Sequence, residues 1–278
     1  MTNIVASTIT PCFRMQKYLK LFLEELPKQT FFNHLEVVLD HNEPTEEELI
    51  WVKDFQEKYP NRLKHIVVNP VEPIGTSMNR CIKEASGRFL TIWNVDDLRT
   101  PDSIEKQVKL LELNSSCDIA NGNFIIVKNF GSKNGQLIDH SIYYPGHKEF
   151  TRGMVLGPFF MFRKTLIEKS GLFDEQLKSG ADFDLAVRMG IHNSNILCTP
   201  GVLGYYLNEG KGASTNGDGK QPTERTVIEL RYGIYDKIEK AWLEKTKNYK
   251  INEILIDGNW EPIEKFVPNY NEFIKNNI

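Results

Sequence analysis

The first hundred residues alternate between short apolar runs and amphipathic stretches. Residues 3–9, 35–40, 65–69 and 88–95 form the apolar runs, and apolar side chains at helical spacing fill the intervals between them. A chain that repeats strand and helix in this way favours parallel strands, because each helix returns the chain to the edge where the next strand begins. The sequence therefore predicts an α/β fold with a doubly wound, mostly parallel sheet and helices on both faces.

Two helix starts carry local signals. Thr45 followed by Glu48 is the capping-box pattern and predicts that a helix opens there. After the fourth apolar run, Thr100 is placed as an N-cap and Pro101 as the first helical residue.

Beyond residue 101 the alternation weakens. Residues 119–127, 159–162 and 196–207 still predict strands, and residues 182–189 predict a helix. A long amphipathic helix with one apolar stripe is expected near the end of the chain, and the stripe consists of Leu230, Ile234, Ile238 and Trp242.

Length and charge limit the function. The 278 residues suffice for one large domain or for a domain with an appendage, and the net charge of −3 provides no globally basic surface for nucleic acid. No apolar run is long enough for a transmembrane helix, and the N-terminus does not resemble a signal peptide. We expect a cytoplasmic protein, and peripheral contact with the inner face of a membrane is compatible with the sequence. Its cysteines are scattered without metal-ligand spacing and predict free thiols: Cys12, Cys81, Cys117 and Cys198.

Asp96 and Asp97 directly follow the fourth predicted strand. In open α/β sheets, ligands bind at the carboxyl ends of the strands. Two adjacent carboxylates repel each other, and a hard divalent cation relieves this repulsion. Aspartates are also common in solvated turns, so the pair by itself favours neither interpretation.

Several motifs occur in the order and spacing of one enzyme family. They are Thr10-Pro11-Cys12-Phe13-Arg14, Asp40, the run with Gly75, Asn79, Ala85 and Gly87, Asn94-Val95-Asp96-Asp97, and the later segments 157–164, 171–175 and 180–185. With these motifs, residues 3 to 215 resemble the family-2 glycosyltransferases, which are inverting enzymes with a GT-A fold. Two positions depart from the family pattern. Arg14 stands where the family has Asn, and Asn94 replaces the first acidic residue, which is expected to weaken metal binding.

The resemblance implies a metal-dependent transferase that moves a sugar from a nucleotide sugar, in the first instance a UDP-sugar, to a hydroxyl group. It implies Asp96, helped by Asp97, as ligands of Mn²⁺ or Mg²⁺, and Asp182 as the general base. The acceptor would be a glycan or a lipid-linked saccharide, and a homodimer is compatible with these features. The residues implied in nucleotide binding are Pro11, Asp40, Gly75, Asn79, Asn94 and Asp96.

The same resemblance divides the chain. Residues 1–222 would form the catalytic domain, with a nucleotide-binding half of about 1–100 and an acceptor half of about 101–222. A C-terminal helix and tail, 223–278, would follow. Lys211 and Ser214 lie in a glycine-rich loop that could close over the diphosphate or act as a linker.

Individual residues also have structural interpretations. Asp182 could be a helix N-cap, and Asp40 could be a turn residue. Asp184 is expected to be structural or to face the acceptor, and Arg188 to lie in an ion pair or on the surface. Trp93 is expected in the core. No role is assigned to His41, His65, His140 or His192.

Two other functions compete with the transferase. Sugar-phosphate nucleotidyltransferases also have paired acids on an α/β sheet, but they carry a glycine- and arginine-rich loop after the first strand, which residues 10–14 do not match. A catalytically degenerate protein that only binds sugar or a partner is suggested by Asn94 and Ala181, because acidic residues are common at these positions in the family.

Overall fold

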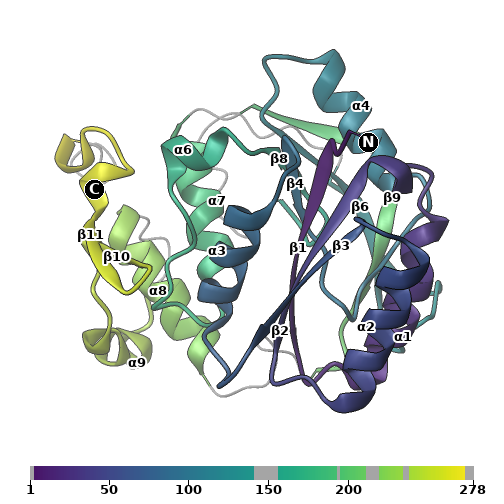
Figure 1. Ribbon diagram of the computed structural model, residues 1–278. Helices are drawn as coiled ribbons and strands as arrows, with labels where there is room; N and C mark the ends of the chain where they lie inside the picture. The colour runs from purple at the N-terminus through teal and green to yellow at the C-terminus, as the bar shows by residue number, and fades with distance from the viewer. Residues whose placement is uncertain (1–2, 141–155, 193–194, 211–218, 234–237, 273–278) are drawn as a thin grey trace.

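A computed structural model describes residues 3–140, 156–192, 195–210, 219–233 and 238–272 of the chain. The described residues contain one nine-stranded sheet in the order β3-β2-β1-β4-β8-β6-β9-β5, with β7 paired to β6 (Figure 1). A separate antiparallel hairpin lies near the C-terminus. The strands of the sheet are β1 (Ala6–Phe13), β2 (Leu35–Asn42), β3 (Leu63–Val68), β4 (Phe89–Ile92), β5 (Leu98–Arg99), β6 (Ile119–Val127), β7 (Gln136–Ile138), β8 (Met161–Arg163) and β9 (Ile196–Leu207); the hairpin is β10 (Glu253–Ile256) and β11 (Asn259–Pro262).

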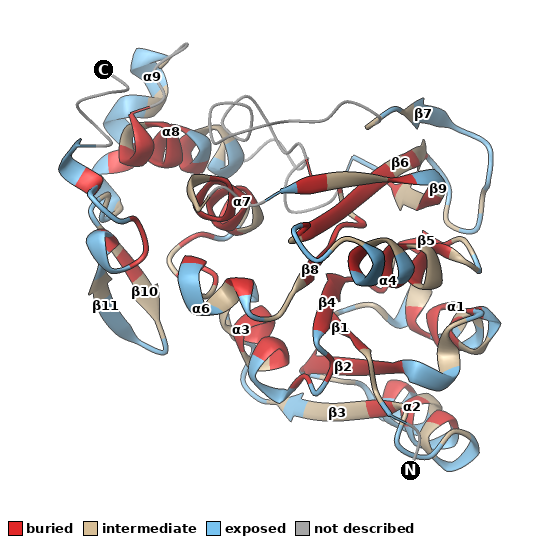
Figure 2. Cartoon of the chain, turned by 90° about the horizontal axis from the view of Figure 1, so that it is seen from above, coloured by how far each residue is buried: buried red, intermediate tan, exposed pale blue. Residues whose placement is uncertain are grey.

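Helices cover both faces of the sheet, as the sequence predicts (Figures 1 and 2). One face is covered by α1 (Gln16–Glu25), α2 (Glu46–Lys58) and α4 (Ser103–Leu113). The other face is covered by α3 (Ile74–Glu84), α6 (Leu166–Ser170), α7 (Ala181–Ile191) and α8 (Lys220–Tyr232). The described residues also contain five short helical segments: η1 (Leu26–Lys28), η2 (Phe32–His34), α9 (Lys240–Leu243), η3 (Glu244–Asn248) and η4 (Ile263–Lys265).

The N-terminal half of the sheet is parallel and buried on both sides. β1 pairs in parallel with β2 and β4, and β2 with β3, whereas β5, β7 and β8 pair antiparallel with their neighbours. Successive residues of β2 contribute to opposite cores: Val37 and Leu39 pack on the α1–α2 face, and Val38 on the α3 face. Apolar residues are therefore needed on both faces, which explains the nearly continuous apolar runs.

Strand bounds agree closely with the predictions in β6 and β9. β1 differs, because it continues past Pro11 to Phe13. Its ladder with β4 ends at Ile9, while its ladder with β2 continues through Pro11. Pro11 therefore sits where the strand has a partner on one side, a position that tolerates the missing N–H.

One of the two predicted helix starts is confirmed and one is wrong. The Thr45 N–H donates to Glu48 Oε2 at 2.8 Å, and the Glu48 N–H donates to Thr45 Oγ1 at 3.2 Å, which completes the capping box. By contrast, α4 begins at Ser103, two residues after Pro101. Thr100 Oγ1 donates instead to the Val202 carbonyl of β9 at 2.9 Å. This contact with a distant strand holds Thr100 at the edge of the sheet and takes it out of the capping position.

The predicted long C-terminal helix is also interrupted. α8 ends at Tyr232, and Gly233 follows with φ of 68°, the left-handed conformation typical of a helix terminus. Its buried apolar side chains include Val227, Ile228 and Tyr232, so the buried face differs from the predicted stripe. Ile234 lies outside the described residues.

The tail packs against the rest of the protein. Ile254, Ile263 and Phe266 belong to the same core cluster as residues of α3, α7 and α8. Within the described ranges, no helix combines the length and the apolar character needed to cross a bilayer.

Candidate functional site at the carboxyl edge of the sheet

The parallel strands bring most of the predicted donor-site residues to one edge. Pro11 of β1 lies directly opposite Asp40 of β2 in the strand register, and both stand near the carboxyl ends of their strands. Asn94 and Asp96 follow the adjacent β4. Because β1, β2 and β4 run in the same direction, these four residues share the carboxyl edge of the sheet (Figure 1).

The polar residues of the turn after β4 differ in how far they are buried. Asn94 and Asp96 are half-buried, whereas Asp97 is 1% exposed. Asp97 Oδ1 accepts a hydrogen bond from the Leu207 N–H at 2.9 Å, and Oδ2 accepts one from Asn94 Nδ2 at 3.3 Å. Trp93, buried in the core as predicted, donates from Nε1 to the Asp97 carbonyl at 3.0 Å. Asp97 thus ties the turn to the end of β9, and this use of both its oxygens leaves Asp96 as the accessible carboxylate.

The electrostatics of this turn suit a cation. Burial raises the pKa of Asp96, and the negative charge of Glu209, which follows β9, raises it further. Burial and the neighbouring Asp96 raise the pKa of Asp97 well above its ordinary value. Each of these shifts shows that negative charge is disfavoured here in the absence of a counter-ion. A hard divalent ion bound to Asp96 would relieve this cost, so the residues present fit a metal site.

Asp40 lies at the predicted edge of the sheet, but its carboxylate is hydrogen-bonded to neighbouring side chains. Its Oδ2 accepts a hydrogen bond from Arg80 Nη1 at 2.7 Å, and its Oδ1 accepts one from Asn42 Nδ2 at 2.8 Å. Burial raises the pKa of Asp40, and bonds from Ser77 and Arg80 partly oppose this rise. Arg80, which also pairs with Glu72, has no signal in the sequence that would identify it. A contact between Asp40 and a nucleotide remains a prediction.

Gly75 and Asn79 lie on the side of α3 that faces the loop before α7. A Cβ at Gly75 would lie 3.1 Å from Cα of Glu175, so glycine lets the helix approach the backbone of this loop closely. Asn79 Nδ2 donates to the Phe173 carbonyl at 3.0 Å and to Glu175 Oε1 at 2.9 Å, and its Oδ1 accepts from the Phe173 N–H at 2.8 Å. Gly75 thus allows close packing against the loop, and Asn79 holds the loop by hydrogen bonds. A nucleotide contact by either residue stays a prediction.

Asp182 is the second residue of α7, and Gly180 occupies the N-cap position. β9 is parallel to β6, and β6 and β4 are both antiparallel to β8, so β9 runs in the same direction as β4. Because α7 is followed by the amino end of β9, the first turn of α7 lies toward the carboxyl edge of the sheet (Figure 1). Asp182 Oδ1 accepts a hydrogen bond from the Phe183 N–H at 2.8 Å. Burial is the largest cause of a raised pKa for Asp182, and the charge of Glu224 adds to it.

Gly180 does not need glycine for its backbone conformation. Its φ is −112°, a value open to every residue type. A Cβ at this position would lie 3.1 Å from Ile228 Cδ1 and 3.3 Å from Glu224 Cβ. Glycine therefore lets α8 pack closely here, because a larger residue would have to displace these side chains by a few tenths of an ångström.

Glu224, which the sequence analysis does not single out, holds the backbone that leads to Asp182. Its Oε2 accepts hydrogen bonds from the Ser179 N–H at 2.7 Å and the Gly180 N–H at 2.8 Å, and its Oε1 accepts one from the Lys178 N–H at 2.9 Å. One carboxylate from α8 thereby fixes the backbone immediately before Asp182.

Asp184 and Arg188 belong to a buried ionic network. Asp184 Oδ2 lies 2.8 Å from Arg188 Nη2, and its Oδ1 lies 2.7 Å from both Arg231 Nη1 and the Tyr232 hydroxyl. All four side chains are fully buried. The structural interpretation of Asp184 and the ion-pair interpretation of Arg188 are therefore confirmed.

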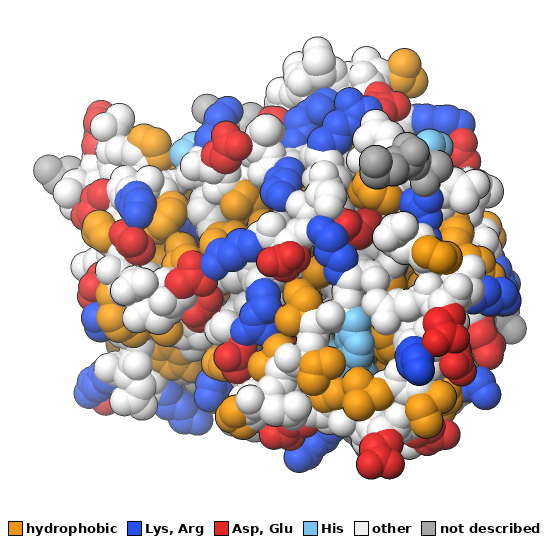
Figure 3. Space-filling model, viewed as in Figure 1, with side chains coloured by type: hydrophobic (Ala, Val, Ile, Leu, Met, Phe, Trp, Pro, Cys, Tyr) orange, Lys and Arg blue, Asp and Glu red, His pale blue; other side chains and the backbone are white. Residues whose placement is uncertain are grey.

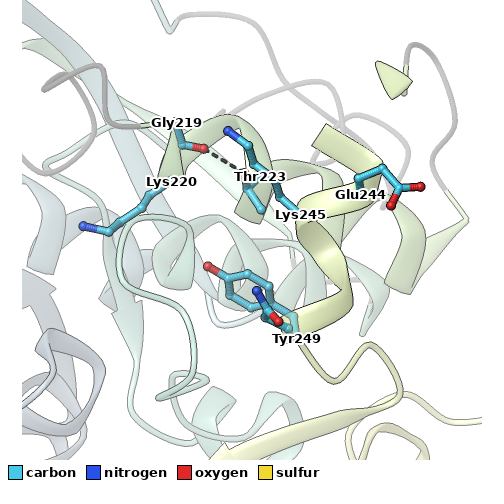
Figure 4. A pocket seen from close by; sticks show the side chains of 7 residues that line it. Gly219, Lys220, Thr223, Glu244, Lys245 and Tyr249 are labelled. Atoms are coloured by element: carbon cyan, nitrogen blue, oxygen red, sulfur yellow. Dashed lines mark hydrogen bonds between the residues drawn. The ribbon is translucent and has the colours of Figure 1, made fainter. Parts of the chain in front are cut away.

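A separate open pocket of about 380 Å³ lies between the start of α8 and η3 (Figure 4). Lys220 and Thr223 line it from α8, and Lys245 and Tyr249 from the segment beyond α9. The sequence-predicted site residues do not line this pocket. Lys211 and Ser214, the loop residues considered for diphosphate binding, lie outside the described residues. Basic and acidic side chains are interspersed over the face shown in Figure 3.

The α/β sheet with helices on both faces and the aspartate-bearing turn after its fourth strand are features of a GT-A fold. The sequence profile of glycosyl transferase family 2 matches residues 7–171, and the chain belongs to that family.

Individual glycosyltransferases are also similar to this chain in sequence. An uncharacterized glycosyltransferase of Methanocaldococcus jannaschii is 28% identical over 184 residues, which cover 62% of this chain and 60% of that protein. The poly(ribitol-phosphate) β-N-acetylglucosaminyltransferase TarS of Staphylococcus aureus is 24% identical over 213 residues, which cover 74% of this chain and 36% of TarS. The chain thus spans less than two thirds of the length of these relatives.

Solved structures share the fold. The crystal structure of TarS residues 1–349 in complex with UDP-GlcNAc superposes with a TM-score of 0.67 at 19% identity, covering 89% of this chain and 74% of that one. The mannosyltransferase PcManGT of Pyrobaculum calidifontis, in complex with GDP-Man and Mn²⁺, gives a TM-score of 0.59 at 15% identity, covering 87% of this chain and 68% of that one.

Proposed function

We propose that this protein is an inverting glycosyltransferase that transfers a sugar from a UDP-sugar to a hydroxyl of a glycan or lipid-linked saccharide. The observation that carries the proposal is the accessible Asp96 at the carboxyl edge of a GT-A sheet, in the same strand-end set as Pro11 and Asp40. Membership of the family and the UDP-GlcNAc complex of TarS support a nucleotide-sugar donor.

Asp96 would hold Mn²⁺ or Mg²⁺, and the cation would offset the negative charge that grows on the diphosphate as it leaves. The Mn²⁺ in the PcManGT complex supports a divalent ion. Asn94 contributes no charge, and its amide is bonded to Asp97. The protein therefore supplies fewer acidic ligands than a sequence with two aspartates at these positions, and we expect weaker metal binding.

Asp182 would act as the general base. The acceptor oxygen attacks the anomeric carbon as the bond to the diphosphate breaks on the opposite face, and the hydroxyl proton passes to the Asp182 carboxylate. Attack from the opposite face inverts the anomeric configuration. A raised pKa suits this role, because the carboxylate then has greater affinity for the proton it receives. Glu224, through the backbone at 178–180, would position the base.

Donor binding is tested by thermal unfolding with UDP-, GDP- and dTDP-sugars, each with and without Mn²⁺. A bound donor raises apparent stability by mass action, and we expect the largest rise with a UDP-sugar and Mn²⁺. Asp96→Ala should abolish this Mn²⁺-dependent rise and the turnover of the donor. Asp102→Ala, at an exposed aspartate paired with Lys106, is the matched control and should retain both.

Two results would contradict the proposal. Undiminished turnover in excess EDTA or in Asp96→Ala would remove the metal from the mechanism. Donor binding without turnover, with every acceptor class supplied, would favour the alternative of a catalytically degenerate sugar-binding protein. The observation that favours this alternative is Asn94, which stands where the family has an acidic residue.

A further inference from the structure

Three potential metal ligands meet on the α2 side of the sheet. Cys12 comes from β1, His41 from β2 and Glu48 from the first turn of α2. One ligand atom from each of them, the sulfur, a ring nitrogen and a carboxylate oxygen, lie within 4.8 Å of one another. Their exposed fractions are 1%, 0% and 1%, so the cluster is enclosed by protein.

Two polar atoms of this cluster lack a hydrogen-bond partner. They are His41 Nε2, which faces Glu48 Oε2 at 3.7 Å, beyond hydrogen-bond length, and Glu48 Oε1; both are buried. Buried polar atoms are nearly always paired, because burial without a partner forfeits the hydrogen bonds made to water. Two such atoms in one ligand-like cluster indicate that a bound group completes it.

We propose that Cys12, His41 and Glu48 bind one Zn²⁺ ion. Thiolate, imidazole and carboxylate are the ligand types of protein zinc sites, and a hard ion such as Mg²⁺ would disfavour the sulfur and the nitrogen. Zinc bonds of 2.0–2.3 Å in a tetrahedron place ligand atoms about 3.3–3.8 Å apart. His41 Nε2 is 3.7 Å from Glu48 Oε2, and Oε1 of the same carboxylate, which has no hydrogen-bond partner, is the oxygen open to the ion. The three ligand atoms lie within 4.8 Å of one another, so binding would draw them slightly closer together. The ion would enter with part of its hydration shell: one water would carry away the proton of the Cys12 thiol, and another would remain as the fourth ligand.

Neighbouring groups orient two of the ligands. His41 Nδ1 lies 3.2 Å from His65 Nε2. In the tautomer in which His41 donates this bond, its Nε2 keeps a lone pair directed to the cluster. Glu48 is held by its capping-box bonds to Thr45, of which the bond from the Thr45 hydroxyl is 2.9 Å long. A metal here would clamp the ends of β1 and β2 to the start of α2.

This zinc site shares no ligand with the metal proposed at Asp96, although Cys12 is close enough to Asp40 and Asp96 for their negative charges to act on it. Cys12 and His41 each follow a donor-edge residue, Pro11 and Asp40, by one position, and alternate residues of a strand face opposite sides of the sheet. The inference requires neither donor binding nor turnover, so it stands or falls independently of the proposed function.

The test is zinc binding by the full chain after removal of metal with EDTA. Titration against a chromophoric chelator should show one tightly bound Zn²⁺ per chain, and Asp96→Asn should retain it. Cys12→Ala should weaken zinc binding by on the order of 100-fold, because loss of a direct ligand should cost at least as much as loss of an outer-shell partner. The matched control Cys198→Ala, at a half-buried cysteine outside the cluster, should bind normally. His65→Phe should weaken binding by about 10-fold.

Cobalt substitution provides a second measurement that does not depend on the folding of a variant. Co²⁺ in the wild-type cluster should show the ultraviolet charge-transfer band of a thiolate ligand. Absence of stoichiometric zinc binding, or a cobalt spectrum without that band, would overturn the proposal. So would zinc binding that survives Cys12→Ala and disappears in Asp96→Asn, because the ion would then belong to the donor edge.

Discussion

Arg14 departs from the family pattern, and its backbone conformation shows what the departure costs. Its φ is 55°, in the left-handed region that Asn enters more readily than other non-glycine residues. The guanidinium stacks 4.8 Å from the centroid of the Phe13 ring, which offsets part of the strain. The family's Asn thus suits this turn for a backbone reason.

We predict that Arg14→Asn stabilises the protein by about 0.5–1 kcal/mol, since left-handed backbone costs other residues about 1–2 kcal/mol. Urea unfolding of the two proteins measures the difference. Arg14→Ala keeps the strained backbone and loses the ring contact, so it should give no gain. Equal stabilisation by Ala and Asn would contradict this explanation.

Asp182 combines a proposed catalytic role with a cost to stability. Its pKa is raised in the folded protein, mainly by burial. A carboxyl group whose folded pKa is raised contributes stability below its unfolded pKa, about 3.9, and this contribution is lost as the pH rises through the folded value. At neutral pH the ionised carboxylate therefore lowers the free energy of unfolding, and an asparagine at this position would not.

We predict that Asp182→Asn lowers turnover by roughly 10²–10⁴-fold, the usual contribution of a general base, with donor affinity nearly unchanged. The same variant should gain stability over the wild type at pH 8 and gain less at pH 4. Turnover assays and unfolding at the two pH values test both parts. Near-normal turnover would exclude Asp182 as the base, and an equal stability change at both pH values would exclude the titration argument.

At the scale of elements, the loop 171–180 is held from two helices. Asn79 of α3 bonds the backbone N–H and carbonyl of Phe173, and Glu224 of α8 accepts from the N–H groups of Ser179 and Gly180 at the other end of the loop. The loop leads directly to Asp182, so the position of the proposed base depends on helices that are distant in sequence.

Asn79→Ala separates a bracing role from a nucleotide-binding role. The change leaves the buried Phe173 N–H without its partner, which costs about 1–3 kcal/mol. We expect lower thermal stability and reduced turnover, with UDP affinity unchanged in isothermal titration. Lys83→Ala, on the same helix at a half-exposed ion pair, should alter neither. A selective loss of UDP affinity at full stability would instead support the nucleotide contact.

At the scale of the whole molecule, one ionic network joins the tail to the sheet domain. Arg231 of α8 bonds to Asp174 at 2.9 Å and to Asp184 of α7 at 2.7 Å, and it donates to the Ile251 carbonyl at 2.8 Å. The side chains are fully buried. Together with the shared core, this network indicates that the described parts of the tail, 223–233 and 238–272, contribute to the stability of the whole fold.

We predict that Arg231→Met destabilises the protein by about 3–5 kcal/mol, because it leaves two buried carboxylates short of a counter-charge. Arg225→Met on the same helix is the control. Arg225 is about half exposed and paired with Glu229, so its loss should cost no more than about 1 kcal/mol. Similar small effects of both changes, measured by chemical unfolding, would show that the buried network is not a determinant of stability.

The sequence could predict those features that depend on local pattern. The alternation of apolar runs and helical stretches gave the parallel half of the sheet, and Asp96 could be placed because a strand visibly precedes it. The Thr45 capping box is complete within four residues, and its prediction is confirmed. The start of α4 was predicted wrongly, because Thr100 bonds to a strand a hundred residues away.

Only the tertiary structure decided which side chains meet. Asp96 and Asp97 are equivalent in sequence, yet the N–H of Leu207 fixes one inward and leaves the other accessible. Likewise His41 carries no signal by spacing, but strand pairing and helix packing bring it to Cys12 and Glu48. The physical reason is range: periodicity and caps are set by neighbours along the chain, whereas burial, charge balance and ligand geometry are set by residues that only folding brings together.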